Sequence, residues 1–165
     1  MNKSYLRSLQ IGFIAGMRAM SAPALLSRKL SQVIPNEDPK HLLQYLAQPA
    51  TTKVLTALAG GELLGDKLPS APNRTSPPQF IARIGMGAAC GAVVSEVEGQ
   101  KMPIGAVLGG LGAVAGTLLF FNLRRWLDHD LGLPDTLGAL AEDALVATAG
   151  LAIVDGIKPT GYLAY

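Results

Sequence analysis

The residues of chemical interest in this sequence are a few charged side chains that stand inside long apolar segments. They comprise one arginine, one lysine and four acids: Arg18, Glu62, Asp66, Lys67, Glu142 and Asp143. Glu62 and Asp66 are four residues apart, a spacing that places both on one face of a helix. In a bilayer each such charge costs roughly 2.5–3.5 kcal/mol near a helix centre. We therefore expect these side chains to face the interior of a helix bundle.

Arg18 needs an acidic or aqueous partner, and the acids of the other two segments are its natural partners. In one interpretation Arg18 forms a salt bridge with Glu62 or Glu142 that fixes three helices together. In the other, the charged residues form a binding site for an ion, a proton or a small polar solute, which is what intramembrane charges indicate by default. Asp66, Lys67 and Asp143 can instead extend toward the interface. Both interpretations stay open.

Other kinds of chemistry have little support in the sequence. The acids offer the oxygen ligands that a hard cation prefers, but no His or Cys spacing indicates a transition metal. No Walker loop, nucleophile elbow or dinucleotide fingerprint occurs. We therefore expect no cofactor, no resident metal and no catalytic residue. A net charge of +2 without a basic stripe argues against nucleic acid as a partner.

The elements that position these residues are apolar helices. The chain is 49% hydrophobic and 16% charged, against about 25% charge in ordinary soluble domains. Residues 102–123 carry no charge and as a helix would cover about 33 Å, enough for a ~30 Å hydrocarbon core. Arg124, Arg125 and Trp126 follow, and such residues suit the headgroup region. Four further segments are less clear, at residues 8–26, 51–64, 80–97 and 137–154.

Together these segments predict an all-α polytopic membrane bundle of about five spans in a single domain, residues 1–165. Pro23 is expected to kink the second half of the first span. Residues 41–46 are expected to form a short amphipathic helix, on the membrane surface or as an extension of the next span.

Small residues recur at a spacing that suits close helix packing. Gly-x-x-x-Gly pairs place two glycines on one helix face, where another backbone can approach. The glycine faces can make contacts within one chain or between copies in a homo-oligomer, and the sequence leaves both alternatives. Residues 57–63 also resemble residues 139–145, as expected of a duplicated helical hairpin. The glycine pairs are Gly12/Gly16, Gly61/Gly65, Gly87/Gly91, Gly105/Gly109 and Gly112/Gly116.

Three short stretches resemble an uncharacterised family of small bacterial membrane proteins. They are residues 11–19 (IGFIAGMRA), the Glu-x-x-x-Asp-Lys-x-Pro pattern of residues 62–69, and the late acidic pair Glu142 and Asp143. The chain is similar in these stretches to the family of unknown function DUF4126. The resemblance implies a multi-pass protein of the bacterial inner membrane, and it brings no activity with it.

The sequence thus favours a small transporter or channel, with its charged residues lining a site for an ion or a small polar solute. The first alternative is a structural or assembly protein whose charges are internal salt bridges. The second is a membrane-embedded enzyme that acts on lipid, although no motif in the sequence indicates such an activity. The lipid bilayer is the one partner that the apolar segments require.

Overall fold

The computed structural model describes residues 2–35, 41–65, 76–129 and 135–160. Within these ranges the regular secondary structure is all helical and there is no strand, which confirms the predicted all-α class. The helices are α1 (Lys3–Met17), α2 (Ser21–Val33), α3 (Leu42–Ala47), α4 (Pro49–Gly65), α5 (Pro77–Val97), α6 (Met102–His129) and α7 (Asp135–Asp155).

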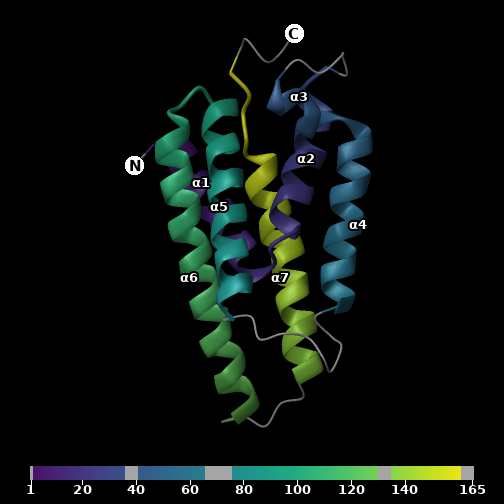
Figure 1. Ribbon diagram of the computed structural model, residues 1–165, viewed down its shortest axis with the longest axis vertical. Coiled ribbons are helices and arrows are strands. Elements are labelled where there is room, and N and C mark those ends of the chain that lie inside the picture. Colours follow the sequence, from purple (N-terminus) through teal and green to yellow (C-terminus); the bar gives the residue numbers. More distant parts are fainter. Residues whose placement is uncertain (1, 36–40, 66–75, 130–134, 161–165) are drawn as a thin grey trace.

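The helices form an elongated bundle, in which α1 lies behind α5 and α6 in the view of Figure 1 and α2 lies beside α7. α1 packs most extensively against α6 and α5, and these three helices form one side of the molecule. α2 lies between α4 and α7, and α7 also contacts α1. Ile11, Ile14 and Met17 of α1 and Leu26 and Leu30 of α2 are buried in the core. The first two helices therefore supply much of the buried surface on which the others pack.

The first apolar segment is broken, whereas the sequence predicted one span with a kink. α1 ends at Met17, Arg18 has an extended backbone (φ −140°, ψ 109°), and α2 starts at Ser21. The physical reason lies in Pro23, whose ring would clash with the carbonyl of residue 19 in a continuous helix. Proline is tolerated in the first turn of a helix, which is where Pro23 stands in α2. Residues 18–20, between the two helices, are called the helix break below.

The prediction of about five spans is not supported. Among the described residues, two helices are long and apolar enough to cross a membrane, Pro77–Val97 and Met102–Trp126, with mean hydropathies of 1.4 and 2.0. The break divides the first segment into helices of 15 and 13 residues. α4 has 17 residues, and α7 carries Glu142 and Asp143 within its first half.

The short helix expected at residues 41–46 is present as α3, which is separated from α4 by Gln48. It buries Leu43 and Ala47 and exposes Leu42 and Tyr45, so it is amphipathic. It lies across one end of the bundle, against α2 (Figure 1).

The C-terminal segment after α7 packs on the turn between α5 and α6. Arg7 of α1 donates to Glu98 Oε1 at 2.5 Å, and the backbone N–H of Lys158 donates to the same oxygen at 3.0 Å. The N–H of Thr160 donates to the carbonyl of Val97 at 2.9 Å. These bonds tie the α5–α6 turn to the start of α1 and to the end of the described chain.

Glycines permit the close packing of α1, α5 and α6. A Cβ at Gly12 would overlap the backbone of Gly109, and one at Gly109 would overlap the carbonyl of Gly87. Gly112 and Gly116 meet the backbone of α1 in the same way. At Gly61, by contrast, an added Cβ meets no atom of the described residues within 4 Å. Four of the five glycine pairs thus lie in helix contacts within the chain. The pair on α4, Gly61 and Gly65, makes no such contact among the described residues.

Gly109→Ala is expected to lower the free energy of unfolding by about 1–3 kcal/mol, because the methyl group forces α5 and α6 apart. Gly61→Ala is the matched control and is expected to raise it by about 0.5–1 kcal/mol, since alanine stabilises a helix where space is open. Thermal unfolding of the purified protein measures both. Equal effects of the two substitutions would contradict the tight α5–α6 contact.

Candidate functional site

The helix break leaves backbone groups that no helix satisfies, and side chains from other helices bind them. At the end of α1, Arg83 of α5 donates from Nη1 to the carbonyls of Gly16 (2.8 Å) and Met17 (2.6 Å). Thr117 Oγ1 of α6 donates to the same Gly16 carbonyl at 3.0 Å. The guanidinium also opposes the partial negative charge at the C-terminus of α1. Arg83 is thus a C-terminal cap contributed by another helix.

The start of α2 is capped in the opposite sense by Glu62 of α4. The N–H groups of Ala19 and Met20 donate to the two carboxylate oxygens of Glu62, at 2.9 and 2.7 Å. Met20, the residue that precedes α2, makes no side-chain cap of its own. A carboxylate suits the partial positive charge at a helix N-terminus. Glu62 Oε1 also lies 3.6 Å from Arg83 Nη2, so the two caps form an ion pair.

Arg18 turns from the break toward α7. Its Nη2 lies 2.6 Å from Asp143 Oδ1, and its Nε lies 3.9 Å from Glu142 Oε1. The Arg18 side chain is 0% exposed. The other Glu142 oxygen, Oε2, lies 3.5 Å from Nη1 of Arg124 on α6. Arg18 therefore pairs with the acids of α7, while Glu62 pairs with Arg83.

Six charged side chains from five parts of the fold meet around the break, and we call them the break cluster. Three are guanidinium groups and three are carboxylates, so their formal charges balance. An isolated charge in a low-dielectric interior is strongly unfavourable, whereas paired charges are tolerated. Pairing with carboxylates and backbone carbonyls explains how side chains as buried as Arg18 and Arg83 are accommodated. The break cluster consists of Arg18, Glu62, Arg83, Arg124, Glu142 and Asp143.

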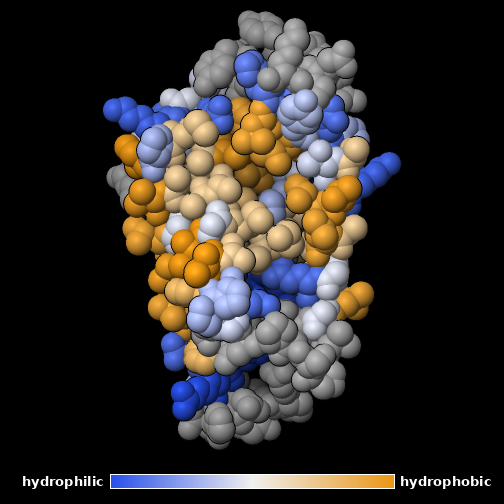
Figure 2. Space-filling view, in the orientation of Figure 1, coloured by the Kyte–Doolittle hydropathy of each residue, from blue (hydrophilic) through white to orange (hydrophobic). Residues whose placement is uncertain are grey.

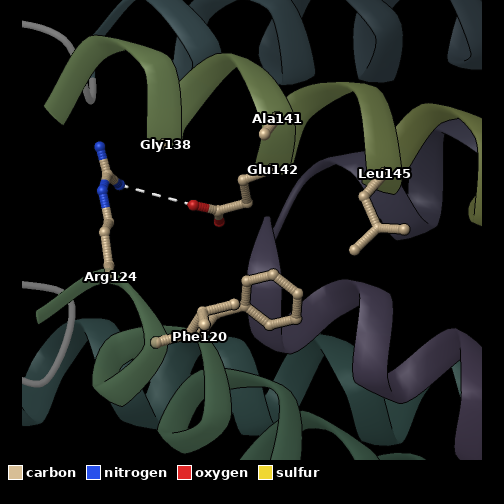
Figure 3. A pocket seen from close by; sticks show the side chains of 7 residues that line it. Phe120, Arg124, Gly138, Ala141, Glu142 and Leu145 are labelled. Carbon is tan, nitrogen blue, oxygen red and sulfur yellow. Dashed lines mark hydrogen bonds and ion pairs between the residues drawn. The ribbon is translucent and has the colours of Figure 1, made fainter. Parts of the chain in front are cut away.

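A cavity lies on each side of the α7 acid pair. The first, of about 160 Å³ between α6 and α7, has Glu142 and Arg124 on its wall, together with Phe120 and Leu145 (Figure 3). The second, of about 200 Å³, lies between α2, α4 and α7 and has Asp143 on its wall. Arg18 contacts both acids from the inner side. The two acids of α7 that pair with Arg18 thus each border a mostly apolar cavity.

Four of the six residues singled out from the sequence meet at the break, namely Arg18, Glu62, Glu142 and Asp143. Asp66 and Lys67 lie outside the described residues. Their role stays a prediction, as does the use of the other four as a binding site.

Sequence reasoning missed Arg83 and Arg124 as site residues. Both stand near the ends of apolar segments, where an arginine ordinarily reaches the headgroups, and the pattern therefore favours an interfacial position for both. The available signal was that Arg83 is the one charged residue between Pro77 and Val94. A single arginine in such a segment requires an acid or a set of carbonyls when the helix is packed on others.

The described residues contain no group of three His, Cys, Asp or Glu side chains arranged to hold a metal ion. Comparison with protein-family models, with curated proteins and with solved structures finds no match. The resemblance to DUF4126 therefore stays a prediction. Over the part of the chain that the structure describes, fold and site together define a class: a helical bundle with two helices long and apolar enough to span a membrane and a buried cluster of paired charges at a helix break.

Glu62→Ala is expected to lower the free energy of unfolding by about 2–4 kcal/mol. It leaves two half-buried N–H groups of the break without their acceptor and removes the carboxylate paired with Arg83. Asp155→Ala is the control, because that acid is 71% exposed and its pair with Lys29 is long, at 3.8 Å. The control is expected to change stability by at most ~0.5 kcal/mol. Thermal and denaturant unfolding measure both, and equal losses would refute the capping role.

Proposed function

We propose that this chain is an integral membrane protein that binds a small ion or polar solute at the break cluster and passes it across the bilayer. The observation that carries the proposal is the coincidence of three features at one place. A helix is interrupted, buried charges converge on the interruption, and cavities border two of those charges. Interrupted helices whose ends face a polar site are a recurring arrangement in secondary transporters.

The exposed side chains support a lipid environment. Large hydrophobic residues are exposed on α4, α5, α6 and α7, among them Val107 (64%) and Leu111 (57%) on α6. On α6 they recur at positions 104, 107, 111 and 118, which form a continuous outward stripe. Apolar residues cover much of the middle of the face in Figure 2. In water a surface of this kind promotes association, whereas lipid solvates it. The bacterial inner membrane is the proposed location.

The end of α1, which Arg83 and Thr117 bind, lies within the depth of the proposed spans rather than at their ends. Thr117, which bonds the end of α1, precedes Trp126 by nine residues. At 1.5 Å per residue this is about 14 Å from the Trp126 end of the span Met102–Trp126. The charges beside the end of α1 therefore fall where insertion is costly, whereas Arg124 stands two residues from the end of the span. Charges at costly positions usually serve a function.

A structural role accounts most directly for one part of the cluster. Glu62 and Arg83 satisfy the backbone of the break, and this role is complete without a solute. Arg18 pairs instead with Glu142 and Asp143, and these two acids border the two cavities. We therefore assign stability to the first pair and solute binding to the other three residues.

Cysteine accessibility tests the membrane embedding. The natural cysteine, Cys90, is buried, so the labelling of added cysteines is measured against a low background from Cys90. In membranes, Leu111→Cys is expected to resist a water-soluble maleimide because its side chain faces lipid. Lys101→Cys, in the exposed turn before α6, is expected to react once both sides of the membrane are accessible. Rapid labelling of both variants in intact and permeabilised membranes would contradict the embedding.

Flux through proteoliposomes tests the proposed site. We expect at least one of protons, Na⁺, K⁺, Cl⁻ or small neutral and zwitterionic solutes to pass. Glu142→Gln is expected to slow that flux about tenfold or more, since it removes a charge from the cavity wall. The control, Asp155→Asn, makes the same change at an exposed position of the same helix and is expected to leave flux unchanged.

Thermal unfolding of the same variants separates function from structure. The transport proposal expects Glu142→Gln to lose flux while its unfolding temperature stays close to that of the natural protein. If no solute passes, or if flux falls only in step with stability, the structural alternative is favoured and the transport function is wrong.

A further inference from the structure

The cavity of about 200 Å³ between α2, α4 and α7 is a groove with a mostly apolar wall, and we call it the α2 groove. All three helices contribute small or aliphatic side chains to it. Ala147 on its wall is exposed, so the groove is open to the surroundings of the bundle. The apolar residues of the wall include Ala24 and Leu25 of α2, Ala59 and Leu63 of α4, and Val146 and Ala147 of α7.

The α2 groove follows α2 outward from the helix break. Its inner end is at Ser21, the first residue of α2, and at Asp143, whose carboxylate lies 2.6 Å from Arg18. Its outer end is at Arg28, seven residues further along α2. At 1.5 Å per residue this is a length of about 10 Å. The groove therefore connects the level of the break with one end of the bundle.

The outer end of the groove lies level with the turn that joins the two candidate membrane spans. Lys29, next to Arg28 in the sequence, lies 3.8 Å from Asp155 at the end of α7. The residue after Asp155 approaches Arg7, and Arg7 pairs with Glu98 in the α5–α6 turn. These contacts cross the bundle from α2 to the ends of α5 and α6. In a bilayer the outer end would thus stand near the headgroups, and the inner end at the depth of the acyl chains.

The outer end of the groove is also basic. Arg28 and Lys53 are exposed there, and neither has an ion-pair partner among the described residues. The two are held near each other because the hydroxyls of their sequence neighbours, Ser27 and Thr52, lie 2.9 Å apart. An arginine at such a place lays its stem along an apolar wall and keeps its guanidinium at the surface. Two cations beside an apolar groove complement a ligand with an anionic head and a hydrocarbon chain.

We infer that the α2 groove binds one acyl chain of an anionic phospholipid, whose phosphate is held by Arg28 and Lys53. Arginine matches phosphate oxygens with two parallel donors, and basic residues near the membrane surface attract anionic lipid. The acyl chain lies along α2 and points from the headgroup level into the bilayer, as the chains of the surrounding lipid do. The lipid fills the cavity on the Asp143 side and leaves the cavity on the Glu142 side open. The inference rests on the membrane embedding proposed above and is independent of transport.

Native mass spectrometry of the full-length protein, titrated in a neutral detergent, tests the inference with three probes. Dimyristoyl phosphatidylglycerol has an anionic head, dimyristoyl phosphatidylcholine has the same chains with a zwitterionic head, and glycerol phosphate has the anion without chains. Phosphatidylglycerol is expected to bind about tenfold or more tightly than phosphatidylcholine, and glycerol phosphate is expected not to bind. Equal binding of the two lipids would overturn the inference. Binding of glycerol phosphate as tight as that of the lipid would show a site for free anions instead.

Substitutions at the outer end locate the headgroup. Arg28→Gln and Lys53→Gln are each expected to reduce the preference for phosphatidylglycerol over phosphatidylcholine about fivefold, and the double variant to remove most of it. Arg125→Gln is the control, because it makes the same change at an exposed arginine near the opposite end of the bundle. The preference compares two lipids on one variant, so a loss of stability alone does not change it. An undiminished preference in the double variant would overturn the assignment of the headgroup site.

A substitution on the wall of the groove locates the acyl chain. Ala147→Trp is expected to weaken phosphatidylglycerol binding about tenfold, since the indole occupies the groove from an exposed position and does not enter the core. Ala144→Trp is the control, because Ala144 is also exposed on α7 but is not on the groove wall. Equal losses in the two variants, or no loss in Ala147→Trp, would show that the chain binds elsewhere.

The remaining outcomes separate this inference from the other proposals. If the spectra show a lipid-free dimer that Ala147→Trp dissociates, a second copy of the chain covers the groove and the lipid site is wrong. If lipid selectivity is absent while Leu111→Cys stays protected from the maleimide, the lipid site fails and the membrane embedding stands. Rapid labelling of Leu111→Cys would refute the embedding itself, and a lack of flux in proteoliposomes affects neither result.

Discussion

The break in the first helix is the constraint on which the rest of the structure depends. Backbone N–H and carbonyl groups inside a fold must find partners, and at the break the carbonyls of Gly16 and Met17 and the N–H groups of Ala19 and Met20 find them on side chains rather than within a helix. Arg83, Thr117 and Glu62 supply them from three different helices. The positions of α4, α5 and α6 are therefore linked to one short stretch of chain, and the signs of the two charged caps follow from the dipoles of the helix ends they face.

Close approach of the helices makes these bonds possible. Gly16 lies against the backbone of Ala113 and Thr117, so that the Thr117 hydroxyl reaches the carbonyl at the end of α1. Gly87 lies against Gly109 one turn from Arg83, and this contact sets the distance of α5 from α6. A larger side chain at these positions would move the donors away from their acceptors. The small residues thus serve the polar centre as well as the packing.

The charged side chains of the break cluster form two groups, according to whether they bind the backbone of the break or other charged side chains. Glu62 and Arg83 complete the backbone hydrogen bonds, whereas Arg18 pairs with Glu142 and Asp143, which border two cavities. The first group is the salt-bridged centre that one interpretation of the sequence expected, and the second is where we propose that a solute binds. Pairing of opposite charges is what makes their burial tolerable.

The sequence by itself determined the helical class and the long apolar helix α6. It also identified Arg18, Glu62 and Glu142 as charged residues whose position in apolar segments has to be explained. These features depend on local composition and on the free-energy cost of burying a charge, which are readable along the chain. Only the tertiary structure decided the partners. Arg18 pairs with Asp143, 125 residues away, and Arg83 reaches the carbonyls of α1, 66 and 67 residues away. Pairings of this kind depend on which helix faces meet, and helix packing rather than local pattern sets those faces.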